Sequence, residues 1–160
     1  TGVADDKAVY TYIPKIINYY LNEDPILNNI KTYQLGNREE MDYVIKNIDK
    51  MVVKKTDGSG GYGMLMGTSA TENEIDDYIK KIKAKPNNFI AQPTLSLSTS
   101  PCIIEGELTP RCVDLRPFAV FGARGIKVCP GGLSRVALKK GSLVVNSSQG
   151  GGSKDTWIIK

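Results

Sequence analysis

The chain has 160 residues and a mass of 17.5 kDa, and its 41% hydrophobic and 24% charged residues are ordinary for a globular protein, which excludes a fibre or a disordered tail. It contains no histidine, which excludes the Ser-His-Asp and Cys-His triads, His-ligated zinc and imidazole acid–base catalysis. The net charge of +4 arises mainly in residues 101–160, which hold nine basic and four acidic side chains. Because no aromatic stripe interleaves with these basic residues, we expect no nucleic-acid partner. Two interpretations of these basic residues remain: a pocket for phosphates or carboxylates, and an ordinary solvated surface.

The cysteine and hydropathy patterns bear on the compartment. Three cysteines without C-x-x-C spacing fit a reducing environment, and we expect a cytoplasmic protein. No stretch approaches the roughly eighteen consecutive apolar residues of a membrane span, so we expect no membrane partner. The sequence leaves the oligomeric state open.

The first half of the chain predicts helices and short strands. The helices span residues 5–21, 37–47 and 69–85, and the strands span residues 32–35, 51–55 and 64–66. Pro14 is expected to kink the first helix or to delay its start. Ser69 and Glu72 have the spacing of a capping box and predict the start of the third helix.

From Phe89 onward the chain predicts strands. They span residues 89–92, 102–104, 111–121, 126–128, 133–138, 142–146 and 157–159. The turn signals Gly131-Gly132 and Lys140-Gly141 separate some of them. Helices followed by a largely antiparallel sheet indicate an α+β fold.

The most informative segment is residues 52–67, in which a strand ending in Lys54-Lys55 leads into a glycine cluster and then into a second short strand. The glycines are Gly58, Gly60, Gly61 and Gly63. Glycines this dense let the backbone approach a ligand and turn several N–H groups toward one anion. A wide hairpin turn without a ligand is the alternative interpretation.

Three common phosphate-binding loops do not fit this segment. The cluster matches G-x-G-x-x-G, but a Rossmann loop opens directly into a helix, whereas a strand is predicted here. A Walker A loop carries lysine directly after its last glycine, where this chain has Met64. A protein-kinase loop carries its lysine on the strand after the loop, whereas Lys54 and Lys55 precede it.

A lysine-bearing strand followed by a glycine-rich hairpin resembles the ATP-grasp fold, in which the lysine contacts nucleotide phosphates and the hairpin closes over them. Lys54 holds the position of the family's strand lysine, and Lys55 stands where a proline usually follows. Neighbours on a strand point to opposite faces, so only one of the two faces the nucleotide. A solvated surface lysine is the alternative. The predicted helix over residues 69–85 and Gln92 on the next strand match the elements that lead to the adenine hinge.

The later motifs sharpen the resemblance. Asp114-x-Arg116, then Arg135, then Asn146 with two glycines four and five residues later, resemble the series in ATP-grasp glutamate ligases and their glutathione-synthetase relatives. Nearly the whole chain closely resembles the circularly permuted ATP-grasp family. The segments that carry this resemblance include TGVADDKAVY, YYLNEDPIL, KTDGSGGYGMLMG, QPTLSLSTSP, RCVDLRPFAVFG, PGGLSRVAL and SLVVNSSQGGGSKDTWI.

The resemblance implies ATP-dependent ligation of a small-molecule or peptide carboxylate to an amine through an acylphosphate, with ATP and Mg²⁺. It also implies a mainly helical N-terminal segment, residues 1–48, and an ATP-grasp nucleotide-binding portion, residues 49–160. The implied cofactor-binding residues are Lys54, Gly58, Gly60, Gly61, Gly63, Gln92 and Asp114. The implied catalytic residues are Arg116 and Arg135, and Asn146 is the implied metal ligand.

Several alternatives stay open. Arg116 is expected mid-strand, where it meets either an anion or Asp114, two residues away on the same face. Asn146 is either a ligand or an ordinary turn residue. The permuted family places its metal-binding half before the glycine loop, so we expect this chain to be a C-terminal portion that is inactive alone. A non-catalytic nucleotide-binding or assembly module, and a structural domain whose glycines only make turns, are the rival functions.

Overall fold

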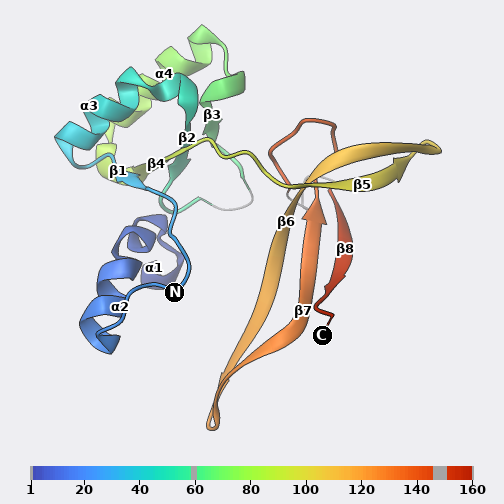
Figure 1. Cartoon of the computed structure of the whole chain (residues 1–160). Helices are drawn as coiled ribbons and strands as arrows, with labels where there is room; N and C mark the ends of the chain where they lie inside the picture. The colour runs from blue at the N-terminus through green and yellow to red at the C-terminus, as the bar shows by residue number, and fades with distance from the viewer. Residues whose placement is uncertain (1, 59–60, 146–150, 160) are drawn as a thin grey trace. The chain divides into compact units, whose positions relative to one another are not determined.

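The computed structural model describes residues 2–58, 61–145 and 151–159, and it divides the chain into two compact units, Thr1–Leu95 and Ser96–Lys160. The α+β prediction is confirmed: helices and one antiparallel sheet form the first unit, and a second antiparallel sheet forms the second unit (Figure 1). The predicted boundary at residues 48/49 falls inside the first unit. It does so because Leu35, Val44 and Ile48 belong to the same hydrophobic core as the strand residue Val53.

The first unit holds a four-stranded antiparallel sheet in the order β1-β4-β2-β3. Its strands are β1 (Tyr33–Gln34), β2 (Met51–Lys55), β3 (Leu65–Met66) and β4 (Phe89–Pro93). Its α-helices are α1 (Gly2–Asp5), α2 (Ile13–Leu21), α3 (Arg38–Lys46) and α4 (Glu72–Ala84). Its 3-10 helices are η1 (Lys7–Tyr12), η2 (Ile48–Lys50), η3 (Gly67–Ser69) and η4 (Pro86–Asn88).

One face of this sheet carries the hydrophobic core. Residues that are paired across antiparallel strands share a face, and the row Tyr33, Ala91, Val53 and Leu65 is buried throughout. Helices α3 and α4 cover this face (Figure 1), with Val44, Tyr78 and Ile82 buried against it. These helices therefore fix the position of β2 and β4.

The opposite face mixes polar and apolar side chains. The row Gln34, Ile90 and Lys54 lies on it, and so does the pair Val52 and Gln92. Val52 and Ile90 are buried there, whereas Lys54 and Gln92 are only half-buried. Lys54 and Gln92 therefore form a polar pair that is partly shielded from water by two buried apolar neighbours.

Helices α3 and α4 begin where a side chain satisfies their first N–H groups, although the predicted start of α4 is wrong. Asn37 accepts hydrogen bonds from the N–H groups at the start of α3, as expected for its predicted start. The capping box of α4 is formed by Thr71 and Glu74, not by Ser69 and Glu72, because Ser69 lies in η3. Pro14 stands in the first turn of α2, so the α-helix starts only at Ile13, as the predicted delay of its start allowed, and η1 replaces the first part of the predicted helix over residues 5–21.

The second unit is an antiparallel meander in which each strand pairs with the next. Its strands are β5 (Thr99–Ile104), β6 (Glu107–Gly122), β7 (Gly125–Val136) and β8 (Gly152–Trp157). A small core forms where Cys112, Ala137 and Val145 pack with Leu97 and Leu143.

Three predictions in this unit are wrong. The strands predicted at residues 126–128 and 133–138 are one strand, because Gly131 and Gly132 do not turn the chain but pair with β8. A Cβ at either position would lie 2.7 Å from a main-chain oxygen, so these glycines serve close strand approach. Residues 142–145 form no strand, and the last strand is β8, which ends at Trp157 where the predicted strand begins.

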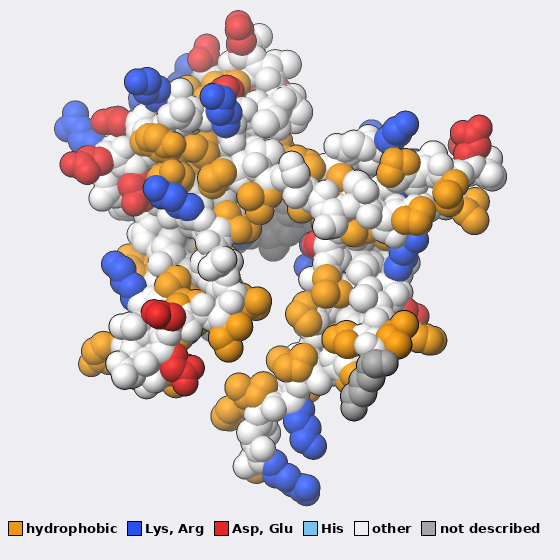
Figure 2. Space-filling view, viewed as in Figure 1, with side chains coloured by type: hydrophobic (Ala, Val, Ile, Leu, Met, Phe, Trp, Pro, Cys, Tyr) orange, Lys and Arg blue, Asp and Glu red, His pale blue; other side chains and the backbone are white. Residues whose placement is uncertain are grey.

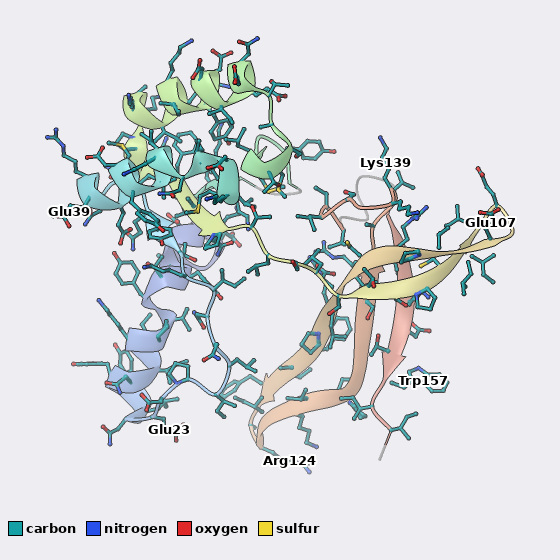
Figure 3. The ribbon with its side chains drawn as sticks, turned by 45° about the horizontal axis from the view of Figure 1, so that its top comes forward. Glu23, Glu39, Glu107, Arg124, Lys139 and Trp157 are labelled. Atoms are coloured by element: carbon teal, nitrogen blue, oxygen red, sulfur yellow. The ribbon has the colours of Figure 1, made fainter. Side chains whose placement is uncertain are left out.

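The distal part of the β6–β7 hairpin exposes apolar side chains. They are Phe118, Val120, Phe121, Ile126 and Val128. Figure 2 shows hydrophobic side chains along this hairpin and basic ones toward its tip, where Figure 3 labels Arg124.

Candidate functional site

Strand pairing brings Lys54 and Gln92 together. Val52 is the partner of Gln92 across β2 and β4, so Lys54, two residues further along β2, projects from the same face. The Lys54 ammonium donates a hydrogen bond to Oε1 of Gln92 over 2.8 Å. Gln92 Nε2 donates to the Thr32 hydroxyl, also over 2.8 Å, which orients the amide so that its oxygen meets the lysine.

Among the described residues, the Lys54 ammonium has a neutral partner but no acidic one. No described carboxylate forms an ion pair with it. Burial lowers the pKa of Lys54, and the positive charge of Lys7 lowers it further. Lys55, by contrast, is exposed and lies on the other face of β2. A half-buried cation without a counter-charge is suited to binding an anion.

Lys7 is a candidate site residue that the sequence analysis missed. Its ammonium donates to the main-chain oxygen of Gly58 in the glycine hairpin, and its own N–H donates to the oxygen of Thr56 over 3.0 Å. Asp6 accepts a hydrogen bond from the N–H of Ala8 and so starts η1 at this point. No local pattern could reveal the contact, because Lys7 and Gly58 are distant in sequence and meet only in the folded chain.

The predicted hairpin around the glycines is confirmed. Val52 pairs with Met66 and Val53 with Leu65, and residues 61–63 form a turn. Gly61 and Gly63 have positive φ angles of 75° and 64°, which residues with a side chain rarely adopt. Gly60 lies outside the described residues.

The side chain of Tyr78 holds the second arm of the hairpin. Its hydroxyl donates to the main-chain oxygen of Gly63, while its ring is buried and packs edge-on against Phe89 at a centroid distance of 5.7 Å. Helix α4 thus anchors the arm that begins at Gly63, and Lys7 contacts the arm that ends at Gly58.

In the second unit, Asp114 and Arg135 form a bidentate ion pair. They are cross-strand partners on β6 and β7, and Arg135 Nε lies 2.9 Å from Oδ1 and 3.2 Å from Oδ2 of Asp114, with Nη2 also donating to Oδ2. The hydrogen bonds from Arg135 lower the pKa of Asp114, and the pair raises the pKa of Arg135. The two implied site residues therefore bind each other.

Arg116 does not pair with Asp114. It is exposed and lies opposite Leu133, whereas Asp114 lies opposite Arg135, and directly opposed side chains are closer than those two residues apart on one strand. The charge of Arg116 still helps to lower the pKa of Asp114. Asn146, the implied metal ligand, lies outside the described residues, and the described residues contain no cluster of three or more His, Cys, Asp or Glu side chains.

Comparison with known proteins identifies the family. The family model described as circularly permuted ATP-grasp type 2 matches residues 1–137. The chain therefore belongs to the circularly permuted ATP-grasp family, as its segments predicted.

The chain is also similar to longer proteins. An uncharacterized protein of Synechocystis sp. is 52% identical over 160 residues, which are 100% of this chain and 33% of that protein. An uncharacterized protein of Mycobacterium tuberculosis is 52% identical over 158 residues, 99% of this chain and 29% of that protein. A Frankia casuarinae protein named "Putative glutamate--cysteine ligase 2-2" is 48% identical over 157 residues, 98% of this chain and 18% of that protein. The chain thus spans a third or less of the length of these relatives. Among its described helices, none has the length and apolar character needed to span a membrane.

Proposed function

We propose that this chain is the nucleotide-binding part of an ATP-dependent ligase that joins a carboxylate to an amine through an acylphosphate. The observation that carries the proposal is the Lys54 ammonium, half-buried, held by Gln92 and without an acidic partner among the described residues. Membership of the ATP-grasp family supports a nucleotide as its anion. The ligase name of the Frankia relative supports the reaction class.

The first unit offers the groups that a polyphosphate needs. Lys54 and Lys7 would supply two positive charges, and the N–H groups of the hairpin glycines would supply neutral donors. Those glycines are Gly58, Gly60, Gly61 and Gly63. Gln92 would position the Lys54 ammonium and contribute its amide at the nucleotide hinge. Burial lowers the pKa of Lys54 and the charge of Lys7 lowers it further, so an anion between the two lysines would offset both effects.

In the second unit, Arg116 is the described cation best able to meet an anion on its face, because it is exposed and has no carboxylate partner in the described part of the chain. Arg135 is bound to Asp114, so it would act as part of a fixed ion pair and not as a free cation. The chemistry that Mg²⁺ supplies in such ligases is charge neutralisation on the transferring phosphoryl group. The described residues do not form a Mg²⁺ site by themselves, so Asn146 stays a proposal and no step here depends on the metal.

A nucleotide-binding or assembly module without turnover is the second candidate function, and it shares the Lys54 site. Since the chain spans at most a third of the relatives' length, we expect the 160 residues alone to bind ATP without ligating substrates. The ligase function would then require a protein of the relatives' full length.

The binding experiment compares two adjacent lysines. Lys54→Met should weaken ATP binding to the chain, measured by calorimetry, by about ten- to a hundredfold, the range for losing a hydrogen bond to a charged group. Lys55→Met is the matched control, because Lys55 is exposed on the other face, and its affinity should stay within about twofold. Equal effects of the two changes would exclude the Lys54 site.

The turnover experiment separates the two candidate functions. In a full-length family member such as the Synechocystis relative, ADP release should rise on addition of a carboxylate and an amine, with glutamate and cysteine as the first pair to test. If neither addition changes the rate of ADP release while ATP binding is intact, the non-catalytic module is favoured.

A further inference from the structure

Arg111, on β6 of the second unit's sheet, is a buried arginine that forms no ion pair with the residues that the structure describes. It lies on β6 opposite Ser100 of β5 and is only 8% exposed. Among the described residues its guanidinium has one hydrogen bond, from Nη1 to the main-chain oxygen of Pro110 over 3.3 Å, and its buried Nε has no acceptor. Buried arginines are rare unless paired, because removing the charge from water is unfavourable without compensating contacts.

The unit itself shows what the free edge of Arg111 can bind. Arg135 uses its Nε and Nη2 donors to hold the two oxygens of Asp114. Arg111 contacts Pro110 through Nη1, so its Nε edge is the one left over. That edge fits a pair of oxygen atoms with the spacing found in a carboxylate or a phosphate.

None of the described carboxylate side chains of the second unit completes this pair. The unit has four acidic residues, of which Glu105 and Glu107 lie at the β5–β6 turn, with Glu107 at its far tip in Figure 3. Asp114 projects from the other face of β6 and is already bound to Arg135. Asp155 pairs with Leu133, which pairs with Arg116, so it too lies on that other face.

The face that carries Arg111 instead holds a second cation. Lys154 of β8 pairs with Ser134 of β7, which pairs with Leu115, and Leu115 shares a face with Arg111. The Lys154 ammonium reaches the main-chain oxygen of Pro101 at 2.5 Å, one residue along β5 from the partner of Arg111. Its contact is with a neutral oxygen, which an anionic oxygen can replace.

We propose that Arg111 and Lys154 form a binding site for a small oxyanion, either a carboxylate or a phosphate. Arg111 supplies a two-donor edge that fixes the ligand's orientation, and Lys154 turns from the Pro101 oxygen to the ligand. The site lies within the second unit and involves none of the residues assigned to the nucleotide. Its test uses no ATP, so its failure would leave the proposed ligase function untouched.

The direct test follows the Nε–H signal of Arg111 by nuclear magnetic resonance in the 160-residue chain, with the signal assigned from its loss in Arg111→Lys. Titration with L-glutamate and, separately, with inorganic phosphate should shift this signal to saturation, while the Nε–H signal of Arg135 stays in place. A response to glutamate alone identifies a carboxylate ligand, and a response to phosphate alone identifies a phosphoryl ligand. No saturable shift with either, or the same shift with sodium chloride at equal ionic strength, overturns the proposal.

Variants supply a second measurement. Arg111→Lys should bind at least about tenfold more weakly, because an ammonium lacks the two-donor edge. Arg111→Met should melt no lower than the parent without ligand, since it removes an unpaired buried charge, and glutamate or phosphate should no longer raise its melting temperature. A clear drop in the unliganded melting temperature of Arg111→Met would show that the guanidinium has a structural partner, and the proposal would be wrong.

Discussion

The Asp114–Arg135 pair gives a prediction whose size follows from its geometry. Three donor–acceptor contacts join the two side chains, which are 29% and 17% exposed, respectively. Exposed ion pairs contribute about 0–1 kcal/mol, and breaking a fully buried pair costs about 3–5 kcal/mol. For this half-buried bidentate pair we expect Arg135→Met to lower the free energy of unfolding of the second unit by about 2 kcal/mol at neutral pH.

The matched control is Arg116→Met, which removes an exposed arginine from the same face of the sheet without breaking an ion pair, and it should cost less than about 0.5 kcal/mol. The assay is hydrogen exchange in denaturant at the Ala137 amide, which donates to the Cys112 oxygen over 2.9 Å and so reports on β6 and β7. Equal losses of stability in the two variants would refute the assignment of Asp114 to Arg135.

The pH dependence of the pair has a definite sign. The hydrogen bonds from Arg135 lower the pKa of Asp114 in the folded chain below its ordinary value of 3.8. The stabilisation is therefore fully present above pH 3.8 and is lost as the pH falls through the lowered pKa, where the folded carboxylate takes up its proton. The stability difference between the parent and Arg135→Met should shrink over that acidic range. A difference that stays constant through it would contradict the ion pair as its cause.

Three further predictions concern the first unit. Gly67→Ala should destabilise it by about 3 kcal/mol in urea unfolding, because the added Cβ would lie 1.8 Å from the main-chain oxygen of Ile48, while Gly2→Ala, in the same unit and with no atom within 4 Å, should be nearly neutral. Thr71→Ala should cost about 1 kcal/mol in the same assay, since it removes the capping side chain of α4. ATP affinity, measured against pH, should decline as the pH rises through the lowered pKa of Lys54, thus below 10.5; an affinity unchanged up to 10.5 would argue against Lys54 as a phosphate ligand.

The elements that the sequence predicted well are those with a strong local signal. Strand β2 and the start of α3 follow from a β-branched run and from Asn37, so both were predicted closely. The break at Gly131-Gly132 was wrong because these glycines read as a turn, whereas their role is to let β6 and β8 approach β7. That role depends on strands distant in sequence, which no local pattern reveals.

Some contacts of the candidate site were likewise predictable from the sequence, and others were not. The Lys54–Gln92 contact was predictable in kind, because the family resemblance assigned both residues to one ligand. Lys7 and the pairing of Asp114 with Arg135 were not, since each contact joins segments that only the tertiary structure brings together. Arg111 lies in a segment that carries the family resemblance, but the resemblance assigned it no role. It is singled out by its burial, which a strand pattern of alternating polar and apolar residues does not disclose.

The strand orders of the two sheets set the sequence of folding events. The meander β5-β6-β7-β8 pairs strands that follow one another in the sequence. In the first sheet, by contrast, β4 must insert between β1 and β2, and this pairs Tyr33 with Ala91, which is distant from it in sequence. Since closing long loops slows folding, we expect the second sheet to form first and β4 to add last. Lys54 and Gln92 lie on the two strands joined in that final step. In a refolding experiment, the ability to bind ATP should therefore emerge only after β6 and β7 are already protected from hydrogen exchange.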